Sequence, residues 1–137
     1  MKTNRPSPFR RDGWPTVAPR IVCADAQGLV RFVKRVFEAR GEYREEHPSE
    51  LWIGESVIMI TEAGVRAVMA AVLYVYVADT DATYRRALKK GAQSIEAPVA
   101  MPYGDYRCMV EDNWGNSWQI ATLRATRVGS QEAVVEK

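Results

Sequence analysis

The residues of this 137-residue chain with the clearest chemical potential are one arginine and two tyrosines that stand in apolar runs. A guanidinium group at Arg20 is costly to bury there unless it is paired. Arg20 therefore indicates either an internal ion pair or a contact with an anionic or carbonyl group of a ligand. Tyr74 and Tyr76 alternate with aliphatic residues, which favours either ordinary strand residues or rings that stack on a ligand. The carboxylates that would serve the ion pair are Glu62, Asp105 and Glu111.

Other aromatic and flexible side chains extend this candidate site. Met59 stands in an apolar segment, where it serves either as core filling or as a thioether contact for an aromatic ligand. Trp114 falls at the tip of an expected hairpin, so we expect it to be exposed and to meet a ligand or a second subunit. The predicted ligand-binding residues are Arg20, Trp52, Met59, Tyr74, Tyr76, Tyr103, Arg107, Trp114 and Gln119.

The chain offers few of the side chains that hold metal ions, with one histidine and two cysteines. His47 lies in an expected turn, which is typical of an exposed residue rather than of a metal ligand. The neighbouring Glu45 and Glu46 would converge on it poorly, because adjacent strand residues point to opposite faces. Cys23 and Cys108 lie in strand-like runs that no secretory signal precedes, so we expect buried, reduced thiols in a cytoplasmic protein.

Charge and hydropathy narrow the class of partner. The formal net charge of +2 is too small to indicate nucleic acid, and charges of both signs are interspersed. The longest apolar stretch, residues 67–78, is far shorter than the roughly 20 residues of a membrane span. We therefore expect the partner to be a small molecule or a second copy of the chain.

Two segments of the chain are alike and predict a duplicated unit. The sequence Ile-Val-Cys-Ala-Asp-Ala at 21–26 and the sequence Val-Tyr-Val-Ala-Asp-Thr at 75–80 are offset by 54 residues, and a helical pattern follows each. A period of this length that occurs only twice fits two supersecondary units that complete each other. We expect the ligand to bind between them.

The first unit is predicted as βαβββ. Residues 17–23 form its first strand, and Asp25 caps a helix that ends at Gly41. Three short strands follow at 42–45, 50–53 and 56–61.

The second unit repeats the pattern. A strand at 69–77 leads to a helix that begins near Thr80 and stops at Gly91, and strands follow at 93–96, 106–111 and 117–122. A loop is expected at 98–104 and a hairpin at 112–116. The predicted organisation is a flexible arm at 1–16, a first module at 17–62, a connector at 63–68, a second module at 69–123 and a C-terminal tail at 124–137.

Two short motifs resemble a known family. Residues 101–105 (MPYGD) and 111–122 (EDNWGNSWQIAT) resemble the C-terminal signature of the PhnB-like branch of the glyoxalase/bleomycin-resistance/extradiol-dioxygenase group, the vicinal-oxygen-chelate superfamily. Residues 13–19 and the helix after Asp25 fit the same pattern. The chain departs from it at Tyr106, where that branch usually has arginine. The resemblance implies an α+β protein whose two βαβββ modules form an open, curved, eight-stranded mixed sheet around a cleft, in a homodimer.

The resemblance also locates the positions at which metal-dependent members carry their ligands. They fall at Ala18 and Met59 in the first module, and at Val72 (or Leu73) and Gln119 in the second. These residue types offer a divalent cation neither imidazole nor carboxylate, so we expect no metal and no cofactor. Strand alternation from these positions turns Arg20, Tyr74 and Tyr76 toward the cleft as well.

The function that these patterns favour is metal-independent binding or sequestration of an aromatic or anionic small molecule. The alternatives are a metal-dependent lyase, isomerase or dioxygenase of the same superfamily, against which the missing ligands argue, and a structural or regulatory module. A metal-free enzyme stays open as a variant, although the sequence shows no positioned base. Its candidate groups are Tyr74, Tyr76 and Tyr106 with Arg20 and Arg107.

Overall fold

The computed structural model describes residues 5–124 of the chain, and these residues form two compact units that divide between Ala70 and Ala71. Each unit pairs one helix with one mixed sheet, so the predicted α+β class is confirmed. The predicted tail at 124–137 lies outside the described residues, except for Arg124. Within the described residues there is no helix long and apolar enough to cross a membrane.

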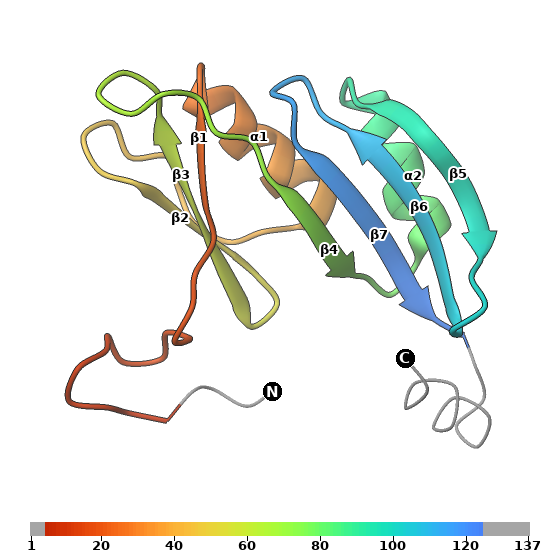
Figure 1. Ribbon diagram of the computed structural model, residues 1–137, viewed down its shortest axis with the longest axis horizontal. Coiled ribbons are helices and arrows are strands. Elements are labelled where there is room, and N and C mark those ends of the chain that lie inside the picture. The colour runs from red at the N-terminus through yellow and green to blue at the C-terminus, as the bar shows by residue number, and fades with distance from the viewer. Residues whose placement is uncertain (1–4, 125–137) are drawn as a thin grey trace. The chain divides into compact units, whose positions relative to one another are not determined.

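The first unit consists of a three-stranded sheet and one helix (Figure 1). Strand β1 (Arg20–Cys23) runs parallel to β3 (Ser56–Glu62), and β2 (Ser49–Ile53) pairs antiparallel with β3 on the other side. Helix α1 (Ala26–Phe37) packs on β2 and β3. The core between them is formed by side chains that include Ile21, Leu29, Val33, Val36, Leu51 and Ile60.

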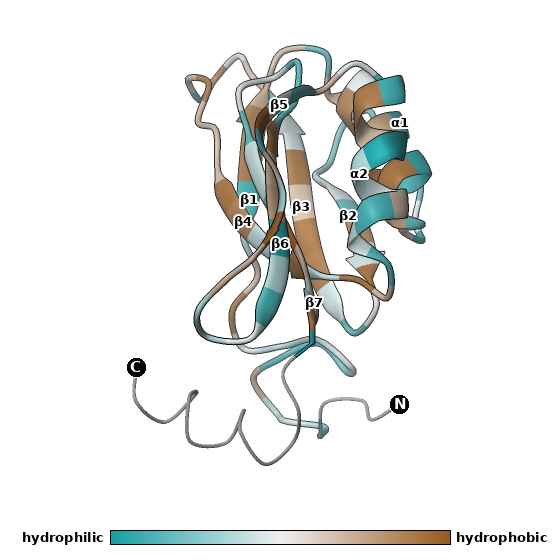
Figure 2. Ribbon diagram, turned by 90° about the vertical axis from the view of Figure 1, so that its right-hand side faces the viewer, coloured by the Kyte–Doolittle hydropathy of each residue, from teal (hydrophilic) through white to brown (hydrophobic). Residues whose placement is uncertain are grey.

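Helix α1 begins where the sequence predicts it. The Asp25 carboxylate accepts a hydrogen bond from the backbone N–H of Gly28 at 3.1 Å, which satisfies one donor of the first turn. Glu62, at the end of β3, accepts two more, from the backbone N–H groups of Asp25 (3.0 Å) and Ala26 (2.8 Å). Figure 2 shows α1 banded with hydrophobic and hydrophilic residues, as an amphipathic helix on a sheet requires.

Three predictions for the first unit are wrong. Strand β1 begins at Arg20, so residues 17–19 are not part of it. Residues 42–45 form no strand, and only the isolated bridge between Arg40 and Trp52 extends the pairing of β2. Helix α1 ends at Phe37, with Glu38 in the left-handed region, rather than at Gly41. Gly41 instead lies close against β2. A Cβ atom there would lie 2.2 Å from the carbonyl oxygen of Glu50, so only glycine permits this approach.

The second unit is a four-stranded sheet in the order β4-β7-β6-β5, with one helix against β5, β6 and β7 (Figure 1). Strand β4 (Val72–Tyr76) is parallel to β7 (Ser117–Leu123), whereas β6 (Asp105–Glu111) is antiparallel to both β7 and β5 (Gln93–Ala100). Helix α2 (Thr80–Lys89) is capped by Asp79, whose carboxylate accepts from the N–H of Ala82 at 3.1 Å.

The strands of the second unit differ from the prediction at their ends. Strand β5 continues to Ala100, through the stretch expected to be a loop, because two register shifts between Ser94 and Val99 let it stay paired with β6 past Pro98. Strand β4 is shorter than predicted, since Met69 instead pairs with Val22 of β1. The structure thus has seven strands in two sheets of three and four among residues 5–124, where the resemblance implies eight in one sheet.

The hairpin between β6 and β7 is held by one buried carboxylate. Asp112 accepts hydrogen bonds from the backbone N–H groups of Trp114 (2.8 Å) and Asn116 (2.9 Å), from the Asn116 side-chain amide (2.9 Å) and from the Trp118 indole (2.8 Å). The Asn116 side chain in turn accepts from the N–H of Ala71 at 2.9 Å. These bonds fix β7 against the start of β4, which sets the register across which the site described below is built.

Candidate functional site

A cluster of polar and aromatic side chains occupies one face of the second unit's sheet. We call it the Asp105 cluster. Tyr106 points toward helix α2, where its hydroxyl donates to Asp81 at 2.8 Å, so its neighbours Asp105 and Arg107 point to the opposite, helix-free face. The members of the cluster are Tyr74 and Tyr76 of β4, Glu96 of β5, Tyr103, and Asp105 and Arg107 of β6.

The sheet register explains how side chains from strands that are not adjacent meet here. Strand β7 lies between β4 and β6, and its Ala121 pairs with Tyr76 on one side and with Arg107 on the other. A methyl side chain at this point leaves room for the long side chains of both neighbouring strands to reach across β7. Gln119, one step along the same face, pairs with Tyr74 and Met109.

Asp105 is the centre of the cluster. Its side chain is buried, with 3% of the residue exposed, and its Oδ2 atom accepts hydrogen bonds from the Tyr74 hydroxyl at 2.6 Å and from the Tyr76 hydroxyl at 2.7 Å. The two tyrosine rings lie 5.5 Å apart at 60° to each other. Tyr74 is nevertheless 40% exposed and Tyr76 63% exposed. The carboxylate therefore anchors the hydroxyl ends of two rings whose remaining surface is open.

The hydrogen bonds continue from Asp105 to a second carboxylate. The Tyr103 hydroxyl lies 3.3 Å from that of Tyr74 and accepts from Nη1 of Arg107 at 3.4 Å. Nη2 of Arg107 donates to Glu96 at 2.7 Å in a charge-assisted pair. One connected network thus fixes side chains from three strands, which is the kind of prior ordering that a binding site needs.

The electrostatics of the cluster keep both phenols protonated. The hydrogen bond to Asp105, together with burial, raises the pKa of Tyr76 to about 12. Burial and the hydrogen bond to Asp105 raise the pKa of Tyr74 well above its ordinary value. Because each hydroxyl proton is already held by the carboxylate, neither tyrosine is suited to act as a general base near neutral pH. The cluster is better suited to binding than to proton abstraction.

The predicted candidates of the first unit form a separate arrangement. Arg20 donates from Nε to the Thr61 hydroxyl at 3.0 Å, and no ion pair between residues 5 and 124 involves it. The carboxylate of Glu62, one of its proposed partners, accepts instead from the start of α1. Met59 lies half-buried on β3, paired with Arg20 on one side and Glu50 on the other.

Trp52 contacts Trp14 and Arg40 of its own unit. Its ring meets that of Trp14 edge-on, with centroids 5.8 Å apart, and the Arg40 guanidinium lies 6.0 Å from the Trp52 ring centroid. Trp14 also carries the guanidinium of Arg11 at 4.1 Å from its ring centroid. Residues 11–14 of the expected arm therefore lie on β2, and Trp52 faces them.

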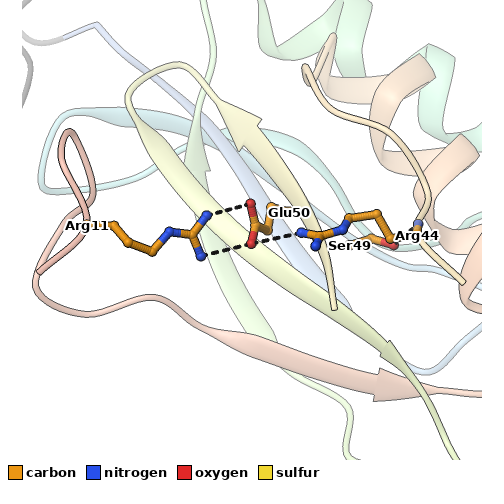
Figure 3. A network of polar contacts seen from close by, with 4 residues as sticks. All are labelled: Arg11, Arg44, Ser49 and Glu50. Carbon is orange, nitrogen blue, oxygen red and sulfur yellow. Dashed lines mark hydrogen bonds and ion pairs between the residues drawn. The ribbon is translucent and has the colours of Figure 1, made fainter. Parts of the chain in front are cut away.

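An ion-pair network ties this N-terminal segment to the sheet, as Figure 3 shows. Glu50 of β2 accepts from both terminal nitrogens of Arg11, at 3.0 and 3.1 Å, and pairs with Arg44 at 3.2 Å. The backbone N–H of Arg44 donates to the buried Ser49 hydroxyl at 2.8 Å. The hydrogen bond from Arg11 is the main cause that lowers the pKa of Glu50. These contacts are structural and leave the Arg11 charge satisfied.

Two predicted ligand-binding residues remain, Trp114 and Gln119. Trp114 lies half-buried in the hairpin, with its backbone N–H bound to Asp112, rather than fully exposed at a tip. Gln119 lies half-buried in the row between Tyr74 and Met109. Of the nine predicted residues, the structure joins Tyr74, Tyr76, Tyr103 and Arg107 by hydrogen bonds.

Sequence reasoning missed Asp105 and Glu96 as members of the site. The sequence suggests Asp105 only as a partner for Arg20, although it alternates with Arg107 on one strand, a spacing that puts both on the same face. Glu96 falls between the two register shifts of β5, so the local sequence does not predict to which face of the sheet its side chain points.

The positions at which the family resemblance implies metal ligands do not form a donor set. Ala18 and Val72 have no ligating atom, and Met59 and Gln119 supply only a thioether and an amide. Among residues 5–124, no group of three or more His, Cys, Asp or Glu side chains lies close enough to hold a metal ion. Both cysteines are buried, and burial raises the pKa of the Cys108 thiol to about 11.

Comparisons with known proteins give one family and several similar folds. The family model described as Glyoxalase/Bleomycin resistance protein/Dioxygenase superfamily matches residues 17–120. No curated protein matches the sequence.

Three solved structures illustrate the similarity of fold. TioX from Micromonospora sp. ML1 is 19% identical, with a TM-score of 0.62 over 78% of this chain and 98% of its own. A glyoxalase/bleomycin resistance protein/dioxygenase family enzyme from Burkholderia phytofirmans PsJN is 20% identical, with a TM-score of 0.65 over 76% of this chain and 94% of its own. The fosfomycin resistance protein FosX from Mesorhizobium loti is 16% identical, with a TM-score of 0.63 over 85% of this chain and 97% of its own. At these identities the likeness concerns the fold alone.

Proposed function

The chain belongs to the glyoxalase/bleomycin resistance protein/dioxygenase superfamily, and we propose that it is a small-molecule-binding member that binds or sequesters an aromatic compound on the Asp105 cluster. The observation that carries this proposal is the pair of exposed tyrosine rings whose hydroxyls are both anchored on one buried carboxylate. Tyrosine gives a large, amphipathic contact surface with only two side-chain torsions to order.

Anchoring is what distinguishes these rings from ordinary exposed strand residues. A free surface tyrosine loses rotamer freedom when a ligand orders it, at about 0.5–1.5 kcal/mol per side chain. Tyr74 and Tyr76 have lost much of that freedom already, because hydrogen bonds of 2.6 and 2.7 Å hold their hydroxyls. A planar ligand would therefore meet a surface prepared for stacking.

An anionic ligand is the other form of the proposal, and a different residue supports it. Arg20 donates one hydrogen bond to Thr61 and forms no ion pair within residues 5–124, so its terminal nitrogens are open to an anion. This support lies in the first unit and is independent of the Asp105 cluster.

We also propose that binding needs no metal at the positions where the family resemblance implies one. The support is the donor chemistry of Ala18, Met59, Val72 and Gln119. Calorimetric titration of chelator-treated protein with Ni²⁺, Zn²⁺, Mn²⁺ and Fe²⁺ tests this. Stoichiometric binding at micromolar affinity would contradict it and favour the alternative, a metal-dependent lyase, isomerase or dioxygenase.

Membership of the PhnB-like branch is proposed from the motifs at 101–105 and 111–122. The homodimer and the single curved sheet around a cleft stay predictions of the family resemblance, and the cytoplasmic location stays a prediction from the two cysteines and the polar N-terminal residues. Sedimentation analysis of the full chain would test the dimer directly.

The test of the aromatic proposal is binding of a neutral planar probe, 2-naphthalenemethanol, measured by calorimetry and by NMR shift changes. We expect the probe to bind to the wild-type chain. Tyr76→Ala should raise the Kd of the probe about tenfold, because this substitution removes the more exposed ring. Tyr84→Ala is the matched control, since Tyr84 lies on α2 and its hydroxyl donates a hydrogen bond to Ser94 rather than to Asp105. Equal weakening by both substitutions, or by neither, would refute the proposed site.

A further inference from the structure

The charge of the Asp105 cluster specifies its ligand more narrowly. We propose that this face binds an aromatic compound that carries a protonated amine next to its ring, with the ammonium group held over Tyr74 and Tyr76 above Asp105. The inference rests on the proposed function and adds the class of ligand.

The first argument is the formal charge. The network contains two carboxylates, Asp105 and Glu96, and one guanidinium, Arg107, so it carries one net negative charge. The guanidinium is already paired with Glu96, at 2.7 Å. The uncompensated charge is therefore that of Asp105, the more deeply buried of the two acids.

The second argument is that the partners of Asp105 leave its negative charge without a cation. No ion pair between described residues involves it, and its hydrogen-bond partners are two neutral phenols that share the Oδ2 atom. Both of these hydrogen bonds end on Oδ2, so neither neutralises the charge of the carboxylate. A buried carboxylate without a cation is unfavourable, and a nearby positive charge on a ligand relieves that cost.

The third argument is the direction of the hydroxyl protons. Both tyrosines donate to Asp105, so the groups they can offer to a ligand are oxygen lone pairs, which accept from N–H donors. The open ring faces attract a cation as well, through the ring quadrupole. An ammonium group matches the lone pairs, the ring faces and the buried charge together.

The same features disfavour an anion at this face. Arg107 is the one cation of the cluster, its side chain is only 13% exposed, and Glu96 occupies its Nη2 atom. A carboxylate ligand would be repelled by the negative charge of Asp105, and Arg107 would not compensate because it is paired with Glu96. The anionic form of the proposal therefore belongs to Arg20 in the first unit.

The experiment compares three probes with one ring system: 2-naphthylmethylammonium, 2-naphthalenemethanol and 2-naphthoate, titrated against the full chain by calorimetry. We expect the ammonium probe to bind at least about tenfold more tightly than the alcohol, and the naphthoate most weakly. The preference should shrink as salt concentration rises.

Two substitutions assign the preference to the cluster. Asp105→Asn keeps a hydrogen-bond acceptor and removes the charge, so the ammonium and alcohol probes should bind about equally. Glu96→Gln, at a half-exposed position, makes the network neutral and should reduce the preference even if Asp105→Asn does not fold. Asp81→Asn is the control. It also removes one negative charge, but from the carboxylate that accepts from Tyr106 on the helix side of the unit, so the preference for the ammonium probe should stay intact.

The outcomes separate this inference from the proposed function. If the alcohol binds as tightly as the ammonium probe and Tyr76→Ala weakens both, the charge inference is overturned and the aromatic site stands. If no probe binds in a manner that depends on Tyr76, the proposed function fails and the inference fails with it. A preference for ammonium that Asp81→Asn abolishes as fully as Asp105→Asn would assign it to the general charge of the unit and overturn the inference.

Discussion

Replacing Asp112 by asparagine should strongly destabilise the second unit, although the side chain keeps its size. The wild-type carboxylate accepts four hydrogen bonds, two at each oxygen. In Asp112→Asn one oxygen still accepts from the backbone of residues 114 and 116. The new amide nitrogen, however, faces the indole N–H of Trp118 and the amide of Asn116, which are also donors.

The expected loss follows from counting the donors that are left without an acceptor. Trp118 and Asn116 are fully buried, so water cannot replace the lost acceptor. An unsatisfied buried donor costs about 1–3 kcal/mol, which gives about 2–6 kcal/mol for the two. A loss of that size is a large fraction of the roughly 5–15 kcal/mol that stabilises a domain.

Urea unfolding followed by circular dichroism and tryptophan fluorescence measures this loss. Thermal unfolding measures the same loss as a fall in Tm, which we expect to be about 6–30 °C at about 3–5 °C per kcal/mol for a chain of this size. Asp79→Asn is the control, because asparagine caps a helix about as well as aspartate and the expected change is below about 0.5 kcal/mol. A loss below about 1 kcal/mol for Asp112→Asn would refute the claim that this carboxylate fixes the hairpin.

Three further predictions test the site and its supports. Ultraviolet difference spectroscopy should show Tyr76 ionising only near pH 12, so its contribution to stability is fully present below about pH 10 and lost as pH rises through about 12, and Asp105→Asn should move the pKa of Tyr76 back toward 10. Glu50→Gln should cost about 1 kcal/mol at neutral pH, measured by urea unfolding. Because the folded-state pKa of Glu50 is below its ordinary 4.5, the wild type should lose this advantage as pH falls through that pKa, with no such loss in the variant. Gly41→Ala should cost about 2 kcal/mol or more by the same measurement, because its Cβ would collide with the Glu50 carbonyl.

The elements that the sequence predicts well are those set by local pattern. Asp25 and Asp79 each precede a helical run, and both cap the expected helices. Alternation along β4 leaves Tyr74 and Tyr76 exposed, while Trp118 and Ile120 of β7 are buried. A period of two depends only on neighbouring residues, so one sequence is enough to reveal it.

The elements that it predicts poorly depend on partners distant in the chain. Residues 42–45 have a strand-like composition but lack a neighbour to pair with beyond the bridge at Arg40. Strand β5 passes through Pro98 because two register shifts accommodate it against β6. The sequence analysis counts Trp52 among the ligand-binding residues, but Trp14 packs against it through contacts that no spacing predicts.

The composition of the Asp105 cluster is itself an argument for a ligand, because the fold does not need it. Two tyrosines and an aspartate could be replaced by phenylalanine and leucine on this face, and replacing both partners of a buried hydrogen bond by apolar groups is often neutral or stabilising. The sheet is already held by its backbone pairing and by the buried side chains on the helix face. A carboxylate that is buried without a cation therefore adds cost without adding a contact that the fold requires. Such a cost is characteristic of sites ordered in advance for binding, where a ligand supplies the missing charge.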